Sequence, residues 1–66
     1  MVHKLEKREY IDGIGWIHWR PVYVFDHDVS ENPRLDALTA FDEMKAGPKV
    51  LYRVVDGLGR LVIEQR

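Results

Sequence analysis

The 66-residue sequence contains no cysteine. A disulfide framework, a thiolate zinc site and a cysteine nucleophile are therefore excluded. A chain of this length buries only about 60% of the surface that its unfolded form exposes. Without disulfides, such a small protein must pack very well, bind a partner or form an oligomer.

Long apolar runs are missing as well. Segment 1–8 has no apolar stretch of signal-peptide length, and no window approaches the roughly 20 apolar residues that span a membrane. We therefore expect a soluble, cytoplasmic protein without a membrane partner. A strong excess of one charge is absent too, because ten Lys and Arg stand against eleven Asp and Glu. This balance argues against a dedicated nucleic-acid binder, which usually carries a clear positive charge.

Glycine is scarce, and four of the five glycines lie in two copies of one pattern. Segments 12–15 and 56–59 both read Asp-Gly-aliphatic-Gly, and each lies between two β-prone runs. Asp-Gly between apolar runs favours a hairpin, because Gly adopts positive φ without steric cost and Asp bonds its own backbone. A phosphate-binding loop would need a following helix, whereas a strand is expected after each turn. The sequence therefore predicts two hairpins with equivalent turns, whose apolar tips, Ile14 and Leu58, either fold back onto the core or touch a partner.

The first hairpin is expected to join a strand over about 4–11 to one over about 15–25. Five charged residues crowd the first strand, which is typical of an edge strand, although a helix over 4–10 is an alternative. Pro21 interrupts the second strand, so a bulge or an unpaired position is expected there. A bulge would let four apolar side chains of this strand point to the core: Ile17, Trp19, Val22 and Val24.

The middle of the chain predicts one helix over 32–47. Asn32 is a suitable N-cap, and Pro33 occupies the favoured first helical position. Gly47 is expected to end the helix, because Gly caps helices and the following Pro cannot continue one. Apolar residues at three-residue spacing form the expected buried face: Leu35, Leu38, Phe41 and Met44.

In the last hairpin, a register that pairs Val55 with Arg60 separates two faces. Two cross-strand pairs then lie on the core side under the helix: Val54–Leu61 and Tyr52–Ile63. Two further pairs lie on the outer side: Arg53–Val62 and Leu51–Glu64.

The predicted order β-β-α-β-β is that of an α+β fold, a four-stranded, mainly antiparallel sheet of two hairpins with one helix packed on one face. We expect a single small domain over 1–66. The strand orders 2-1-3-4 and 1-2-4-3 both make every neighbouring pair antiparallel. In either order, one face of the sheet has no covering helix within the chain.

No catalytic, cofactor or metal signature stands out. The only imidazoles are His3, His18 and His27, and the only serine, Ser30, makes no recognisable triad with them. The run 26–28 reads Asp-His-Asp but lacks the spaced ligands of a calcium loop. We therefore expect a protein that is not an enzyme and that holds no cofactor or metal.

The aromatic segment 16–20 is the best candidate for a contact surface. Its Trp and Arg residues are types enriched at protein–protein hot spots, yet on an open sheet they can stack bases, and in a small protein they can simply fill the core. In size and lack of cysteine, the chain resembles the small accessory proteins of bacteria and their phages, which act mostly by binding another protein.

We therefore expect a non-enzymatic protein-interaction module, accessory or inhibitor-like, that forms a homodimer through its uncovered sheet face or an edge strand, or binds an unknown protein. The expected contact residues are Trp16, His18, Arg20, Leu51, Arg53, Leu58 and Val62. The alternative is binding of single-stranded nucleic acid through Trp16, Trp19 and the basic C-terminal hairpin.

Overall fold

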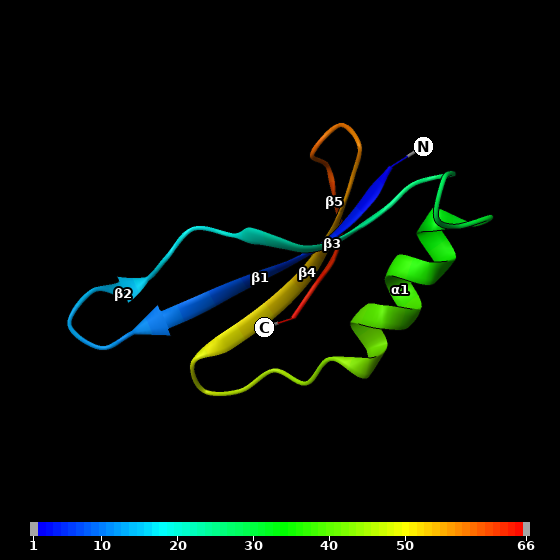
Figure 1. Cartoon of the computed structure of the whole chain (residues 1–66). Coiled ribbons are helices and arrows are strands. Elements are labelled where there is room, and N and C mark those ends of the chain that lie inside the picture. Colours follow the sequence, from blue (N-terminus) through cyan, green and yellow to red (C-terminus); the bar gives the residue numbers. More distant parts are fainter. Residues whose placement is uncertain (1, 66) are drawn as a thin grey trace.

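The computed structural model describes residues 2–65. In chain order it contains β1 (His3–Ile11), β2 (Gly15–Trp16), β3 (Arg20–Phe25), α1 (Pro33–Glu43), β4 (Val50–Asp56) and β5 (Leu61–Glu64). The strands form one antiparallel sheet, and α1 lies on one of its faces (Figure 1). The expected α+β fold of two hairpins and one helix is confirmed. None of the helical structure in residues 2–65 is long and apolar enough to cross a membrane.

The charged strand β1 is the centre of the sheet. It pairs with β4 on one side and with β2 and β3 on the other, and β5 follows β4. This is one of the two strand orders left open by the sequence, 2-1-3-4, with the second expected strand divided in two. The expectation that β1 lies at an edge is wrong. A central strand tolerates these charges because its neighbours pair with them: Arg53 of β4, for example, lies 2.8 Å from Glu6.

The hydrophobic core lies between α1 and the half of the sheet nearest the start of β1. Leu5 and Val54 face each other across β1 and β4, and both are fully buried together with Ala37 of α1. Burying a side chain of this size stabilises the fold by about 1.5–3 kcal/mol. Partly buried apolar side chains complete the core: Phe25, Ala40, Phe41, Met44, Tyr52 and Val62.

Helix α1 starts as predicted. The Asn32 side-chain oxygen accepts a hydrogen bond of 3.1 Å from the Leu35 backbone N–H, and Pro33 opens the first turn. The Leu35 side chain, however, is exposed, because the face that meets the sheet is centred on the small residue Ala37.

The end of α1 differs from the prediction. The helix stops at Glu43, Met44 is extended, and Gly47 forms a bridge with Val50 instead of a helix cap. The side chain of Gln65 explains the early end, because its Nε2 donates to the Met44 carbonyl at 2.8 Å. Its Oε1 accepts from the Tyr52 backbone N–H at 3.0 Å, so the chain leaving the helix is tied to the edge of the sheet.

The second expected strand is interrupted twice. Segment 17–19 separates β2 from β3, and the β1–β3 register shifts beside Pro21, which confirms the expected bulge there and leaves Val22 unpaired. The expected consequence is wrong, because Val22 and Val24 are exposed on a strand at the edge of the sheet. Ile17 and Trp19 are only half-buried and lie outside the core cluster.

The register of the last hairpin differs from the predicted one, because Val55 pairs with Leu61 and not with Arg60. The Asp56 backbone N–H donates to the Arg60 carbonyl at 2.9 Å, and Val54 pairs with Ile63. A register shift between Val54 and Val55 marks a bulge in β5. As a result, Val62 packs against the core cluster, and Arg53 lies across from Glu64.

The molecule is elongated, with principal extents of 41, 21 and 17 Å. The β1–β2 hairpin projects beyond α1 (Figure 1). The two Asp-Gly turns lie at opposite ends of β1, because His3 pairs with Asp56 and Ile11 pairs with Gly15. Their apolar tips do not fold back onto the core: Ile14 is 75% exposed and Leu58 is 79% exposed.

Candidate interaction surface

The outer face, which is the side of the sheet opposite α1, is built from rows of cross-strand neighbours. Directly paired residues of neighbouring strands place their side chains on the same face. The row nearest the start of β1, here called the outer row, takes one residue from each of four strands: Val24, Lys4, Val55 and Leu61. Val24 and Leu61 are largely exposed, whereas Val55 between them is buried. The outer row is thus an apolar strip interrupted by one lysine.

The next row on this face is ionic. It consists of Pro21, Glu6, Arg53 and Glu64. The Arg53 Nε lies 2.8 Å from Glu6 Oε1, and both side chains are mostly buried, with 28% and 13% exposed. The Trp19 ring covers the Arg53 guanidinium at 4.4 Å. The middle of the outer face is therefore covered by the chain itself, and Arg53 is already engaged in contacts within the chain.

The projecting hairpin is held by aromatic and guanidinium contacts. The Arg8 guanidinium lies 5.4 Å from the Trp16 ring and 6.0 Å from the Trp19 ring. Arg8 Nε also donates to the Ile17 carbonyl at 3.1 Å, which fixes the segment between β2 and β3. Tyr10 and Trp16 form an edge-to-face pair at 5.6 Å. Such contacts each contribute about 0.5–1.5 kcal/mol, so the aromatic residues of this segment hold the hairpin in shape.

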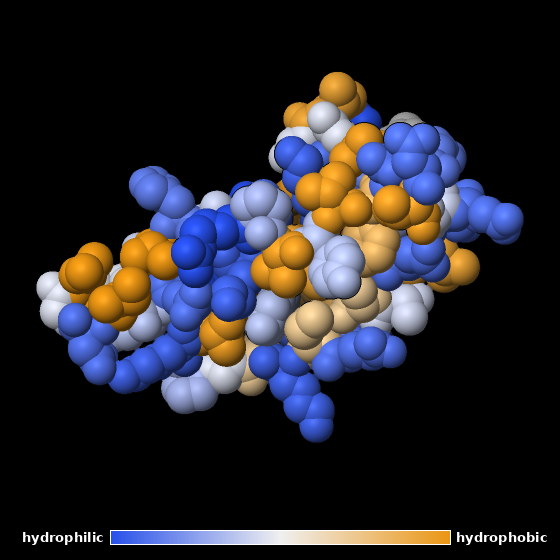
Figure 2. All heavy atoms as spheres, in the orientation of Figure 1, coloured by the Kyte–Doolittle hydropathy of each residue, from blue (hydrophilic) through white to orange (hydrophobic). Residues whose placement is uncertain are grey.

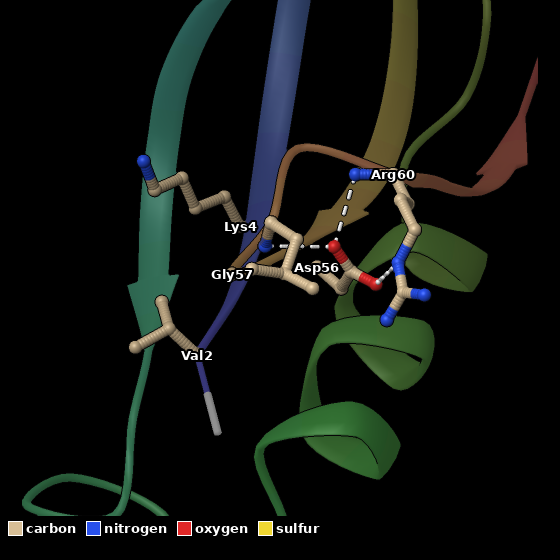
Figure 3. Close-up of a pocket in the computed structure, with 6 residues that line it drawn as sticks. Val2, Lys4, Asp56, Gly57 and Arg60 are labelled. Carbon is tan, nitrogen blue, oxygen red and sulfur yellow. Dashed lines mark hydrogen bonds and ion pairs between the residues drawn. The ribbon is translucent and has the colours of Figure 1, made fainter.

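A hollow of about 540 Å³ lies beside the second Asp-Gly turn (Figure 3). Its lining residues are Val2, Lys4, Asp56, Gly57, Leu58 and Arg60. Asp56 Oδ1 accepts hydrogen bonds of 2.9 Å from the backbone N–H groups of Leu58 and Arg60, and its Oδ2 accepts one of 2.9 Å from Arg60 Nε. Figure 3 shows the Lys4 side chain pointing away from this bonded group. The hollow thus has a fixed polar edge and an apolar opening that adjoins the outer row through Lys4.

The pKa of the Asp56 carboxyl lies below the ordinary value of an aspartate. The hydrogen bond from the Arg60 backbone N–H is the largest cause and lowers this pKa. Desolvation raises it to a smaller extent, while the Leu58 backbone N–H and the Arg60 guanidinium lower it further. The net lowering indicates that the turn is built around an ionised Asp56.

The structure places the seven predicted contact residues in different regions. Trp16, Leu51 and Arg53 share the outer face, because each pairs with, or lies beside, a β1 residue on that side. Arg20 pairs with Lys7 on the other face and contacts Glu9 at 2.7 Å. His18 is exposed between β2 and β3, Leu58 borders the hollow, and Val62 is half-buried against the core cluster.

The sequence did not predict that the outer row forms a surface. Its four residues come from four strands, and they become neighbours only through the strand order and the two bulges. The one signal available in the sequence was the surplus of apolar residues on the side of the last hairpin away from the helix. Figure 2 shows a related feature, because apolar side chains also gather at the tips of both Asp-Gly hairpins.

The histidines do not assemble a metal centre. Within residues 2–65, no group of three His, Asp or Glu side chains is arranged to hold a metal ion. His3 is buried and its Nδ1 has no hydrogen-bond partner among the described residues. It borders a small hollow at the start of α1 together with His27, Glu31 and Arg34.

Comparisons of the chain with protein-family models, with curated proteins and with solved structures gave no significant match.

Proposed function

We propose that the protein is a non-enzymatic interaction module that forms a homodimer through the outer row of its sheet. The observation that carries this proposal is the exposure of Val24 and Leu61 on either side of Val55, on the face away from α1. Exposed apolar side chains that gather on one face of a small protein favour an interaction site there. A dimer shields them without any change of fold.

The position of the outer row beside the hollow supports this proposal. An interface of ordinary size buries about 800 Å² per partner. That is about one sixth of the 4800 Å² of accessible surface of this chain. The outer row and the adjoining hollow at the Asp56 turn together offer apolar area at one end of the outer face. The ionic row and Trp19 border it on the other side and supply a polar rim of the kind found around interfaces.

The experiment compares two exposed leucines. Leu61 of the outer row is 55% exposed, and Leu35 on α1 is 58% exposed. We expect Leu61→Lys to raise the dimer dissociation constant by about tenfold or more, because it buries an unpaired charge, and Leu35→Lys to leave it unchanged. Sedimentation velocity across micromolar to millimolar concentrations measures both. A monomer mass for the unmodified protein over that whole range contradicts the proposal.

One observation favours a second function, binding of single-stranded nucleic acid. Trp16, Trp19, Arg8 and Arg53 lie together on the outer face, and stacked bases need such rings beside positive charge. Against it, these guanidinium groups already occupy the rings of both tryptophans. Fluorescence anisotropy with a labelled oligonucleotide separates the two functions. A nucleic-acid complex weakens steeply as salt rises, whereas an apolar dimer does not.

A further inference from the structure

Two charged side chains in or next to the outer row form no ion pair among residues 2–65: Lys4 of the outer row and Glu64 of the ionic row. The other charges near them are engaged. Arg53 lies directly across from Glu64, yet its Nε bonds Glu6. Arg60 is bound by Asp56, at the turn from which Lys4 points away.

Lys4 and Glu64 do not form an ion pair with each other within one chain. Lys4 is on β1 and Glu64 on β5, with β4 between them, and they belong to successive rows. Two strand spacings and one row spacing place their Cα atoms on the order of 12 Å apart. The two opposite charges thus flank the apolar residues Val55 and Leu61 on a diagonal of the same face.

A two-fold axis between two copies gives both charges an ion-pair partner. In a symmetric dimer, if residue i of one copy contacts residue j of the other, then j also contacts i. The axis lies between the two outer faces and crosses the line from Lys4 to Glu64 at its midpoint, at a right angle. It places Lys4 of each copy opposite Glu64 of the other copy. Building on the proposed dimer, we infer that two reciprocal ion pairs, Lys4 of each copy with Glu64 of the other, set the orientation of the two outer faces.

The division of roles follows from the chemistry of the two kinds of residue. Burial of Val24 and Leu61 is non-directional and favours many orientations of two sheets. Opposite charges favour the one arrangement in which they meet, and like charges disfavour the alternatives that place Lys4 against Lys4. The partner that fits the outer row is therefore a second copy of this chain, because the same face supplies both signs of charge.

Charge reversal tests the inference. We expect Lys4→Glu and Glu64→Lys each to raise the dimer dissociation constant by about tenfold, because each places like charges together. The double variant K4E/E64K restores the pairs with their signs exchanged, and its dissociation constant returns to within about threefold of the unmodified value. Lys45→Glu and Glu43→Lys are the matched controls, because both residues are exposed outside the outer face. Circular dichroism is the check that each variant folds.

Each outcome bears on one of the two proposals. If the unmodified protein is a monomer, the proposed function fails and the ion pairs fail with it. If it is a dimer that the single reversals leave unchanged, the dimer stands and the ion pairs are refuted. If the single reversals weaken the dimer and the double variant does not recover, the two residues do not face each other, and the inferred orientation is wrong.

Discussion

The two Asp-Gly turns share one sequence pattern and fold differently. In turn 12–15 both glycines have positive φ, 86° at Gly13 and 100° at Gly15. In turn 56–59 only Gly59 does, with a φ of 79°, while Gly57 lies outside the left-handed region. The expectation that the two turns are equivalent is therefore wrong.

The aspartates of the two turns also act differently. Asp56 accepts hydrogen bonds from its own turn, where Arg60 supplies both a backbone N–H and a guanidinium group. Asp12 instead contacts Lys49 Nζ at 2.8 Å, in an exposed ion pair with the segment that precedes β4. The residue after each turn accounts for the contrast, because Trp16 offers no charge to Asp12 where Arg60 binds Asp56. The tetrapeptide predicts that the chain turns, and the flanking residues determine which partners the aspartate of the turn binds.

The largest predicted effect comes from valine at the glycines with positive φ. We expect Gly13→Val and Gly59→Val each to lower the free energy of unfolding by about 1–3 kcal/mol, because a β-branched residue fits that backbone poorly. Gly57→Val should cost less than about 1 kcal/mol, since its Cβ would meet Val2 at ordinary contact distances of 3.4 and 3.5 Å. Urea denaturation measures all three. Equal losses at Gly13 and Gly57 would restore the equivalence of the turns.

The next largest effect concerns how the contributions of Asp56 and Asp12 to stability depend on pH. The folded-state pKa of Asp56 is lowered, so its contribution to stability is present above the ordinary carboxyl pKa of about 4 and is lost as pH falls through the lowered value. We expect Asp56→Asn to be less stable than the unmodified protein at pH 7, with the gap narrowing as pH falls below about 4.

Asp12→Asn is the matched control for this experiment. Its ion pair with Lys49 is exposed, and such pairs contribute about 0–1 kcal/mol. We expect a change within about 0.5 kcal/mol at pH 7, measured by urea denaturation at each pH. A larger loss in Asp12→Asn than in Asp56→Asn would show that the ion pair to β4, and not the hydrogen bonding inside the second turn, holds the hairpins together.

Local signals in the sequence predicted much of the fold. The turns, the helix start at Asn32 and the bulge beside Pro21 each depend on a few neighbouring residues, and the structure has all of them. The early helix end depends on Gln65, which is distant in sequence from Met44. The register of the last hairpin depends on a bulge in β5, and no residue type near it predicts that bulge.

The candidate site was harder to predict than the fold. Charge on β1 indicated an edge strand, but the long-range pair Glu6–Arg53 and the cover from Trp19 make a central position stable. The aromatic segment was expected to contact a partner, stack bases or fill the core, and in the structure its tryptophans lie over guanidinium groups of the same sheet. The residues of the outer row can be identified as neighbours only from the strand order, the pairing and both bulges together. The sequence alone therefore did not predict this row.

The smallest effect on stability is expected at the two apolar tips, where the turns differ in their surroundings. Ile14→Ser and Leu58→Ser should each change the free energy of unfolding by less than about 0.5 kcal/mol, because both side chains are exposed. Leu58 borders the hollow that it shares with Lys4, whereas Ile14 lies at the opposite end of β1. We therefore expect Leu58→Ser alone to weaken the dimer, by a few fold, in sedimentation velocity. If Ile14→Ser weakens it instead, the projecting hairpin and not the outer row forms the interface.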